Sequence, residues 1–373
     1  MVNRCGVVLL ALALSAPAMG DERKVHFVGD FESGVIPAKE ATHDGFYVAT
    51  LPDPQTGDTT LHTGQSTFGP TSAADTRVVS SDVVGGETVR PRRGNYFVRT
   101  EVFRDKNYLQ LNDFSKNRPR SKIYMSDPNH RVNYDEEGFV GFSIYIPKNF
   151  ENELAVRDHR GSSMLFEMGS DSHQSMMNLG VWVQSPSNEA HWFLRVYTNS
   201  KSVRDDDEHV EVFDLGPVSS DKGRWTDFVF RYRFNPFSVT TNPGAAGISA
   251  ARNQVYEGNK GILQVWKSEG TAESDGDRRM AMKIDKVNQP VGLVPHATEK
   301  LRHYWRIYKF GWLSNPTSLT HSVWFGFDEI RQGLVNRDGT TFADVAPSGT
   351  PCSTDCVASL DTKPRPPASL AVE

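Results

Sequence analysis

The sequence predicts an all-β fold of two packed antiparallel sheets, a sandwich or jelly roll. Short runs of alternating apolar and polar residues recur along the chain, and Gly, Pro, Asn and Asp bound them. Few stretches between these runs show helical periodicity with capping residues. No segment repeats with a fixed period, which argues against a propeller or a solenoid. A dozen or so strands without intervening amphipathic helices are typical of two packed sheets.

The first twenty residues have the composition of a secretory signal peptide. Arg4 supplies a positive charge, residues 7–14 are apolar, and Ala18-Met19-Gly20 forms a small-residue cleavage site. The apolar segment is too short to cross a bilayer, and no later segment is apolar enough to do so. We therefore expect a mature chain, residues 21–373, that is exported to the periplasm or the extracellular space without a membrane span.

The predicted strands follow one another within residues 21–333, which we expect to form one β domain. Their bounds are Lys24–Phe31, Tyr96–Phe103, Lys122–Met125, Phe139–Ile146, Ser163–Met168, Leu179–Gln184, His191–Tyr197, Glu208–Phe213, Thr226–Phe234, Gly261–Trp266, Met280–Ile284, Tyr304–Trp312 and Val323–Ile330. Three long stretches interrupt the pattern, and we interpret Thr50–Gly94 and Asn235–Asn259 as loops. We interpret residues 334–373 as a C-terminal tail that either wraps the domain or extends away from it.

The cysteines and the charge exclude some classes of protein. Cys352 and Cys356 make a poor zinc site because no further Cys or His lies nearby, so we expect a disulfide within the tail. Without residues 1–20 the chain carries 40 basic and 46 acidic residues, a net charge of −6. A dedicated nucleic-acid-binding protein would normally be basic, but a local basic groove can still bind another polyanion.

Aromatic and basic residues gather in the predicted strand that begins at Tyr304. Alternation places Tyr304, Arg306, Tyr308 and Phe310 on one face, and it sends Lys309 to the face of the residues between them. Such a face would suit the floor of a cleft for a polar polymer. An ordinary outer sheet face is the alternative interpretation.

Two further strands carry charged residues on one face. Arg99 and Glu101 share a face in NYFVRTEVF, and the arginine could bind a sugar carboxylate through two hydrogen bonds. A solvated surface ion pair is the alternative. In HWFLRVYT, Arg195 and Tyr197 should lie on the outer surface, where Tyr197 could donate or accept a proton unless it is purely structural.

A carboxylate and two histidines form the next candidate site. Alternation in SMLFEMGSDSHQS places Leu165, Glu167 and Gly169 on the face opposite the apolar residues between them. His159 precedes this strand and His173 follows it. A histidine close to a carboxylate could serve as a general base, although most histidines in loops are simply solvated.

Seven motifs together resemble those of the jelly-roll polysaccharide lyases. The resemblance is to the heparin-lyase and glucuronan-lyase-like group, and more distantly to alginate lyases. The motifs, in order, are DFESG (30–34), RTE (99–101), SIYIP (143–147), GRWTDFVF (223–230), GILQVW (261–266), YKFG (308–311) and FDEIRQG (327–333). The resemblance implies a concanavalin A-like β-jelly roll and a secreted lyase that cleaves a uronic-acid-containing anionic polysaccharide by β-elimination.

The resemblance also implies roles for particular residues. An Arg, Gln or Asn would neutralise the substrate carboxylate, a His or Tyr would remove the C5 proton, and a Tyr would protonate O4. Gly169 and Leu313 occupy the positions where such lyases carry a His and a Tyr. The candidate residues are therefore His159, His173, Tyr197, Tyr304 and Tyr308 for catalysis and Arg99, Glu101, Glu167, Arg195 and Lys309 for substrate binding.

Other functions and ligands stay open from the sequence. The two unusual positions leave a non-catalytic carbohydrate-binding protein on the same fold as the alternative. A retaining glycoside hydrolase is less favoured, because no strand carries two suitably spaced carboxylates. Similar jelly rolls hold a structural Ca²⁺ that Glu32 and Asp328 would bind here, although Asp328 could instead cap a strand end. We expect a monomer that requires no cofactor.

Overall fold

The computed structural model describes residues 25, 27–29, 31, 46–50, 74–84, 87–103, 120–125, 132–133, 136–150, 163–170, 175–183, 189–197, 210–234, 261–270, 278–292, 300–309 and 322–347. The predicted signal peptide, the predicted loop Asn235–Asn259 and the predicted Cys352–Cys356 disulfide lie outside these residues. In the described part of the chain, no helix is both long and apolar enough to cross a membrane.

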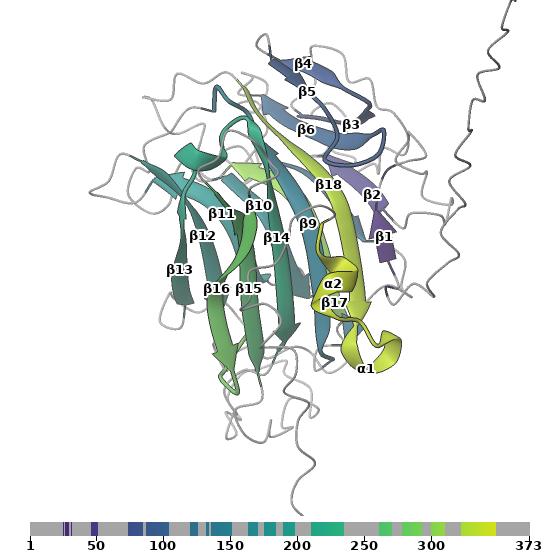
Figure 1. Cartoon of the computed structure of the whole chain (residues 1–373), viewed down its shortest axis with the longest axis vertical. Helices are drawn as coiled ribbons and strands as arrows, with labels where there is room; N and C mark the ends of the chain where they lie inside the picture. Colours follow the sequence, from purple (N-terminus) through teal and green to yellow (C-terminus); the bar gives the residue numbers. More distant parts are fainter. Residues whose placement is uncertain are drawn as a thin grey trace, which may run out of the picture.

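The strands form two sheets that lie face to face as two layers (Figure 1). In sheet A the spatial order is β16 (Arg279–Val287), β15 (Ile262–Glu269), β14 (Arg224–Arg233), β9 (Gly138–Ile146), β18 (Ser322–Leu334), β6 (Phe97–Phe103) and β3 (Ala74–Val79), with β1 (Phe27–Gly29) paired to β18. In sheet B the order is β13 (Val210–Pro217), β12 (Ala190–Tyr197), β11 (Ser175–Val183), β10 (Ser163–Ser170), β17 (Lys300–Lys309), β7 (Arg120–Met125) and β2 (Phe46–Thr50), with β8 (Val132–Asn133) paired to β17.

Every pairing within the two sheets is antiparallel, so the predicted fold class is confirmed. Strands that are neighbours in space are often distant in sequence. The first and last strands of the domain, β1 and β18, lie side by side. Such connections are typical of a jelly roll, in which a sheet is completed by both ends of the chain.

Large apolar side chains fill the space between the sheets. Phe142 of sheet A packs against Phe166 and Trp305 of sheet B, with ring centroids 4.5 and 6.1 Å apart. Strand alternation supplies these residues, since each neighbour along the strand points to the opposite face. Removing a buried aromatic side chain of this size would cost about 3–5 kcal/mol of stability.

A buried acidic residue joins the two sheets where the chain crosses from β13 to β14. The short 3₁₀ helix η4 (Ser219–Asp221) contains Asp221, whose carboxylate accepts a hydrogen bond of 2.8 Å from Trp192 Nε1 of sheet B. Lys267 and Arg278 from the β15–β16 hairpin pair with the same carboxylate at 2.9 and 2.5 Å. Because all three charged groups are buried, loss of the carboxylate would leave two cations without a counter-ion.

The outer face of sheet A, meaning the face turned away from sheet B, is covered by two segments. One segment includes the hairpin β4 (Asp82–Val84) and β5 (Glu87–Val89), and Val89 packs into an aromatic cluster with Phe97, Tyr145, Trp225 and Trp324. The other contains the short helices α1 (Val335–Asp338) and α2 (Phe342–Val345), which follow β18 (Figure 1).

Helix α2 packs tightly against sheet A. Phe342 contacts the ring of Trp266 edge to face at 5.0 Å. A Cβ added to Gly141 would lie only 2.0 Å from the carbonyl oxygen of Val345, so the helix can dock only where the strand carries glycine. Residues 335–346 are thus part of the folded domain.

One loop prediction needs correction, and the predicted tail proves to wrap the domain where it begins, one of the two arrangements expected for it. The stretch Thr50–Gly94 contains β3, β4 and β5, and the predicted tail begins with two helices. Both segments are rich in polar residues, which hid their structural role. Their few apolar residues, such as Val89 and Phe342, are buried against the outer face of sheet A. The sequence does not indicate that this face is covered.

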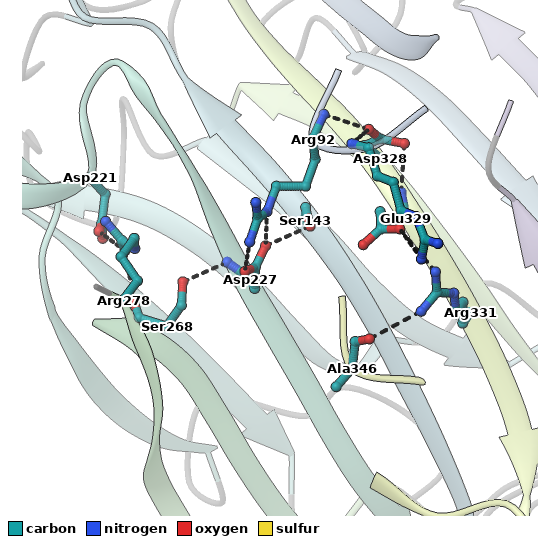
Figure 2. A network of polar contacts seen from close by, with 11 residues as sticks. Arg92, Ser143, Asp221, Asp227, Ser268, Arg278, Asp328, Glu329, Arg331 and Ala346 are labelled. Atoms are coloured by element: carbon teal, nitrogen blue, oxygen red, sulfur yellow. Dashed lines mark hydrogen bonds and ion pairs between the residues drawn. The ribbon is translucent and has the colours of Figure 1, made fainter. Parts of the chain in front are cut away.

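A polar network fastens these segments to sheet A (Figure 2). Asp227 of β14 accepts two hydrogen bonds from the Arg92 side chain, at 3.2 and 3.1 Å, and a third from Ser143 Oγ at 2.7 Å. Arg331 of β18 binds Glu329 at 2.9 Å and donates to the carbonyl oxygen of Ala346 at 3.1 Å. The charged groups of this face are therefore used to hold the covering segments in place.

Candidate functional site

A row of polar residues crosses the outer face of sheet B, the face turned away from sheet A. Cα register pairs Tyr304 of β17 with Glu167 of β10, Glu167 with Asn178 of β11, and Asn178 with Arg195 of β12. Directly opposite residues in antiparallel strands lie about 5 Å apart. We call Tyr304, Glu167, Asn178 and Arg195 the sheet B row. It ends beside Val212 of β13, which is exposed.

Alternation explains why these side chains face outward. On β11, Met177 and Leu179 are fully buried in the core between the sheets, so Asn178 between them must point away from it. On β17, His303 and Trp305 are likewise in the core, and Tyr304 faces outward. The predicted division of the β17 residues between two faces is confirmed for 303–308.

A β-bulge in β10 changes part of the predicted alternation. The register shifts between Met164 and Phe166, so Leu165 lies in the core together with Phe166, and Met164 moves to the outer face. The prediction that Leu165 shares a face with Glu167 is therefore wrong. One extra residue reverses the alternation on one side of a bulge. Glu167 and Gly169 lie beyond it and keep the predicted face.

Arg306 is held tightly on this face. Its NH2 forms an ion pair with Glu167 Oε2 and contacts Met164 Sδ at 2.6 Å, and its guanidinium carbon lies 4.8 Å from the centre of the Tyr308 ring. Arg306 and Glu167 are only 9% and 5% exposed. Arg306 Nε has no hydrogen-bond partner in the part of the chain that the structure describes. The guanidinium is thus fixed and retains an unused donor.

Tyr304 is suited to donate a proton. Burial raises the pKa of its phenol to about 12, and the negative charge of Glu167 adds to this effect. Arg302, which hydrogen-bonds to the Tyr304 side chain, and Arg306 act in the opposite direction. The hydroxyl consequently carries its proton at neutral pH.

Asn178 and Arg195 supply donors on the other side of Glu167. Asn178 Nδ2 donates to Ser175 Oγ at 3.2 Å, and Arg195 is half-buried with its guanidinium carbon 5.8 Å from the Tyr197 ring. Amide and guanidinium N–H groups are the side-chain donors that carboxylates accept best. The sheet B row therefore combines carboxylate-binding groups with a protonated phenol.

Two predicted substrate-binding residues lie elsewhere. Arg99 and Glu101 belong to β6, which pairs with β3 and β18 in sheet A. They form a buried ion pair of 2.5 Å, and the guanidinium carbon lies 5.3 Å from the Trp324 ring. Their shared face was predicted correctly, but the structure places them in a different sheet from Glu167, Arg195 and Lys309, the other predicted substrate-binding residues. Alternation shows which residues share a strand face, whereas sheet membership depends on long-range pairing.

The other predicted site residues have varied positions. Tyr308 is half-buried on the outer face of sheet B, whereas Tyr197 is, like Tyr304, only 3% exposed and not on an open surface as expected. Lys309 ends β17 opposite Ser163, and its side chain is not described. The predicted residues outside the described part of the chain are His159, His173, Leu313 and Glu32.

Asp328 lies in the sheet A network (Figure 2). Its carboxylate accepts backbone N–H groups from Arg92, Arg93 and Glu329 at 2.8, 3.3 and 2.7 Å. Burial raises its pKa to about 8, although these hydrogen bonds act in the opposite direction. Among the described residues, no group of three or more His, Cys, Asp or Glu could hold a metal ion. These N–H donors fit the strand-end cap, and calcium binding with Glu32 stays a prediction.

The sequence did not single out three residues of this face as site residues. Asn178 lies inside the apolar run SMMNLGVWV, and Arg302 and Arg306 flank Tyr304 along β17. Arg302 also lies opposite Gly169, the position where the resemblance places a histidine. The sequence signal that could have identified Asn178 is its position between two apolar residues of this run. It could not reveal which residues of other strands lie opposite.

A family model described as polysaccharide lyase matches residues 55–331. No curated protein sequence matches the chain. Among solved structures, an endo-β-1,4-glucuronan lyase from the fungus Trichoderma reesei has 14% sequence identity and a TM-score of 0.47, and the match covers 81% of this chain and 98% of that one.

Two alginate lyases show weaker likeness. The enzyme from Klebsiella pneumoniae has 7% identity and a TM-score of 0.41, and the match covers 78% of this chain and 95% of that one. The exolytic enzyme from Zobellia galactanivorans has 9% identity and a TM-score of 0.39, with the same two coverages. The family match, which spans most of the chain, identifies the protein family.

Proposed function

The chain belongs to the polysaccharide lyase family, and we propose that it cleaves a uronic-acid-containing polysaccharide by β-elimination at the sheet B row. The observation that carries this proposal is the position of Tyr304. Its protonated phenol lies in one row with Asn178 and Arg195, which can hold a carboxylate. β-Elimination next to a uronate carboxylate requires both groups.

The row supplies groups for every step of the reaction except removal of the C5 proton. Asn178 and Arg195 would hydrogen-bond to the uronate carboxylate and stabilise the negative charge that develops when the C5 proton leaves. Tyr304 would donate its proton to O4 of the departing sugar, since a phenol with a pKa of about 12 is a stronger acid than a sugar alcohol. For the base that removes the C5 proton, the sequence candidates His159 and His173 stay predictions.

Incubation of the purified protein with uronate polymers tests the proposal. Glucuronan, alginate and a heparin-type polymer should be supplied separately, and the ultraviolet absorbance of the unsaturated product should be followed. We expect the absorbance to rise with at least one polymer. If the protein is retained on an affinity gel of one of the three polymers but the absorbance does not rise with any of them, the proposal is contradicted. That result would favour the carbohydrate-binding alternative, which Gly169 suggests because it replaces a histidine of similar lyases.

We also propose that the enzyme acts outside the cytoplasm. The composition of residues 1–20 supports this location, and an extracellular polysaccharide is too large to enter a cell intact. Fractionation of cells that express the full chain tests it. Appearance of the protein in the cytoplasm with residues 1–20 still attached would contradict export.

A further inference from the structure

The pair Glu167–Arg306 lies in the middle of the surface proposed to bind a uronate. Glu167 is flanked in the row by Tyr304 and Asn178, and it binds the NH2 of Arg306. Within β10, β11, β12 and β17, the four strands that carry the row, it is the only acidic residue. A site for an anionic sugar thus contains one carboxylate of its own, paired with an arginine.

We propose that Glu167 stands in for the carboxylate of the uronate next to the one that Asn178 and Arg195 hold, and that it releases Arg306 and takes up a proton when this neighbouring uronate binds. The inference rests on the proposed function and deepens it, because it makes Glu167 the residue that sets affinity for acidic sugars. In the free protein the carboxylate of Glu167 neutralises Arg306. In the complex the uronate carboxylate does so.

The geometry of Arg306 favours this exchange. Contacts with Met164 and the Tyr308 ring hold the guanidinium in place, and neither partner carries a charge that would neutralise it. Its Nε is buried and has no hydrogen-bond partner among the described residues. A planar guanidinium binds a carboxylate best through two parallel N–H groups, and Glu167 uses only NH2. When Glu167 moves away and uncovers Nε, an incoming carboxylate can gain a hydrogen bond that Glu167 does not make.

The surroundings of Glu167 explain why a proton would be taken up. From β17 it faces Tyr304, which is protonated, and the cations Arg302 and Arg306; from β11 it faces the uncharged Asn178, with Arg195 one strand further. Once the uronate occupies Arg306, Glu167 would be a buried carboxylate next to a second one. Burial and a neighbouring like charge both favour the neutral form of an acid.

Calorimetry with a glucuronic acid trisaccharide tests the proposal, with a glucose trisaccharide as the neutral probe. Glu167→Gln should bind the acidic trisaccharide about tenfold more tightly than the wild type, since no internal pair must be broken. The matched control is Glu101→Gln, which alters the equally buried Arg99–Glu101 pair of sheet A and should leave the affinity unchanged. Affinity for the neutral trisaccharide should not differ among the three proteins.

A second measurement needs no variant. Binding heats of the wild type in two buffers with different ionisation enthalpies give the number of protons taken up, which should be greater than zero. Unchanged or weaker affinity in Glu167→Gln, or binding without proton uptake, would overturn the inference while leaving lyase activity intact. Proton-coupled binding of the acidic trisaccharide by a protein that cleaves no uronate polymer would instead reject the proposed function alone.

Discussion

The two sheets carry similar charged pairs on their outer faces, but the pairs have different surroundings. Arg99–Glu101 on sheet A and Arg306–Glu167 on sheet B are almost equally buried, and each arginine lies over an aromatic ring. On sheet A the aromatic cluster and helix α2 cover the face. On sheet B the pair lies in a row with three further polar side chains, Tyr304, Asn178 and Arg195.

This difference separates a structural use of charge from a functional one. Around Asp227 and Arg331, the charged groups of sheet A bind the segments that cover it. Around Glu167, the neighbouring groups are a high-pKa phenol, an amide and a half-buried arginine, which the proposed function assigns to the substrate. Burial and pairing alone therefore do not mark a site; the chemistry of the neighbours does.

The largest expected effect concerns catalysis at sheet B. Tyr304→Phe removes the proposed proton donor and should lower kcat by about 10²- to 10⁴-fold, with the fold retained. Tyr145→Phe, in the aromatic cluster of sheet A, is the matched control and should stay within twofold of the wild type. Product absorbance gives kcat, and circular dichroism checks the fold. Equal losses in both variants would contradict the division between the two faces.

The next effect concerns stability at sheet A. Asp227→Ala leaves Arg92 without its buried partner and should lower the free energy of unfolding by about 3–5 kcal/mol. Urea denaturation measures this loss. The KM for the polymer, determined well below the denaturation midpoint, should not change. A raised KM with unchanged stability would show that the sheet A network takes part in substrate binding.

A smaller effect is expected for Arg195. Arg195→Ala removes one hydrogen-bonding cation from the sheet B row and should raise KM by about tenfold, with little change in stability because the residue is half-buried. Arg99→Ala is the comparison, and it should lower stability without raising KM. Steady-state kinetics and thermal melting of the two variants measure both quantities. The opposite pattern would restore Arg99 as a substrate-binding residue.

A pH dependence of stability is expected at Asp328. Its folded-state pKa of about 8 lies above the unfolded value, so the protonated form stabilises the fold, and this contribution is lost as pH rises from about 4 to 8. The slope should be at most about 1.4 kcal/mol per pH unit. Asp328→Asn should remove that slope in urea titrations with EDTA. If the unfolding free energies of the wild type and the variant change in parallel with pH, the prediction is contradicted.

The same urea titrations, repeated with excess calcium in place of EDTA, test whether Asp328 binds Ca²⁺. If Asp328 binds Ca²⁺, as the sequence allowed, excess calcium should hold the carboxylate ionised and abolish the slope. An unchanged slope would favour the strand-end cap.

Alternation along single strands was the part of the site that could be predicted. It correctly placed Tyr304, Arg306 and Tyr308 on one face of β17, and Arg195 opposite the core residues of β12. It failed where a bulge shifted β10 and moved Leu165 into the core. Nothing in the local sequence reports a bulge, because it depends on the fit between neighbouring strands.

Strand periodicity and motif order are properties of the chain itself, so the all-β class, most strand positions and the family could be predicted without a structure. Only the tertiary structure decided that Arg99 and Glu101 belong to sheet A, and that Asn178 lies between Glu167 and Arg195. Pairing partners and register come from contacts between residues far apart in sequence. The same Arg–Glu chemistry therefore lies against an aromatic cluster on one sheet and faces the proposed substrate on the other.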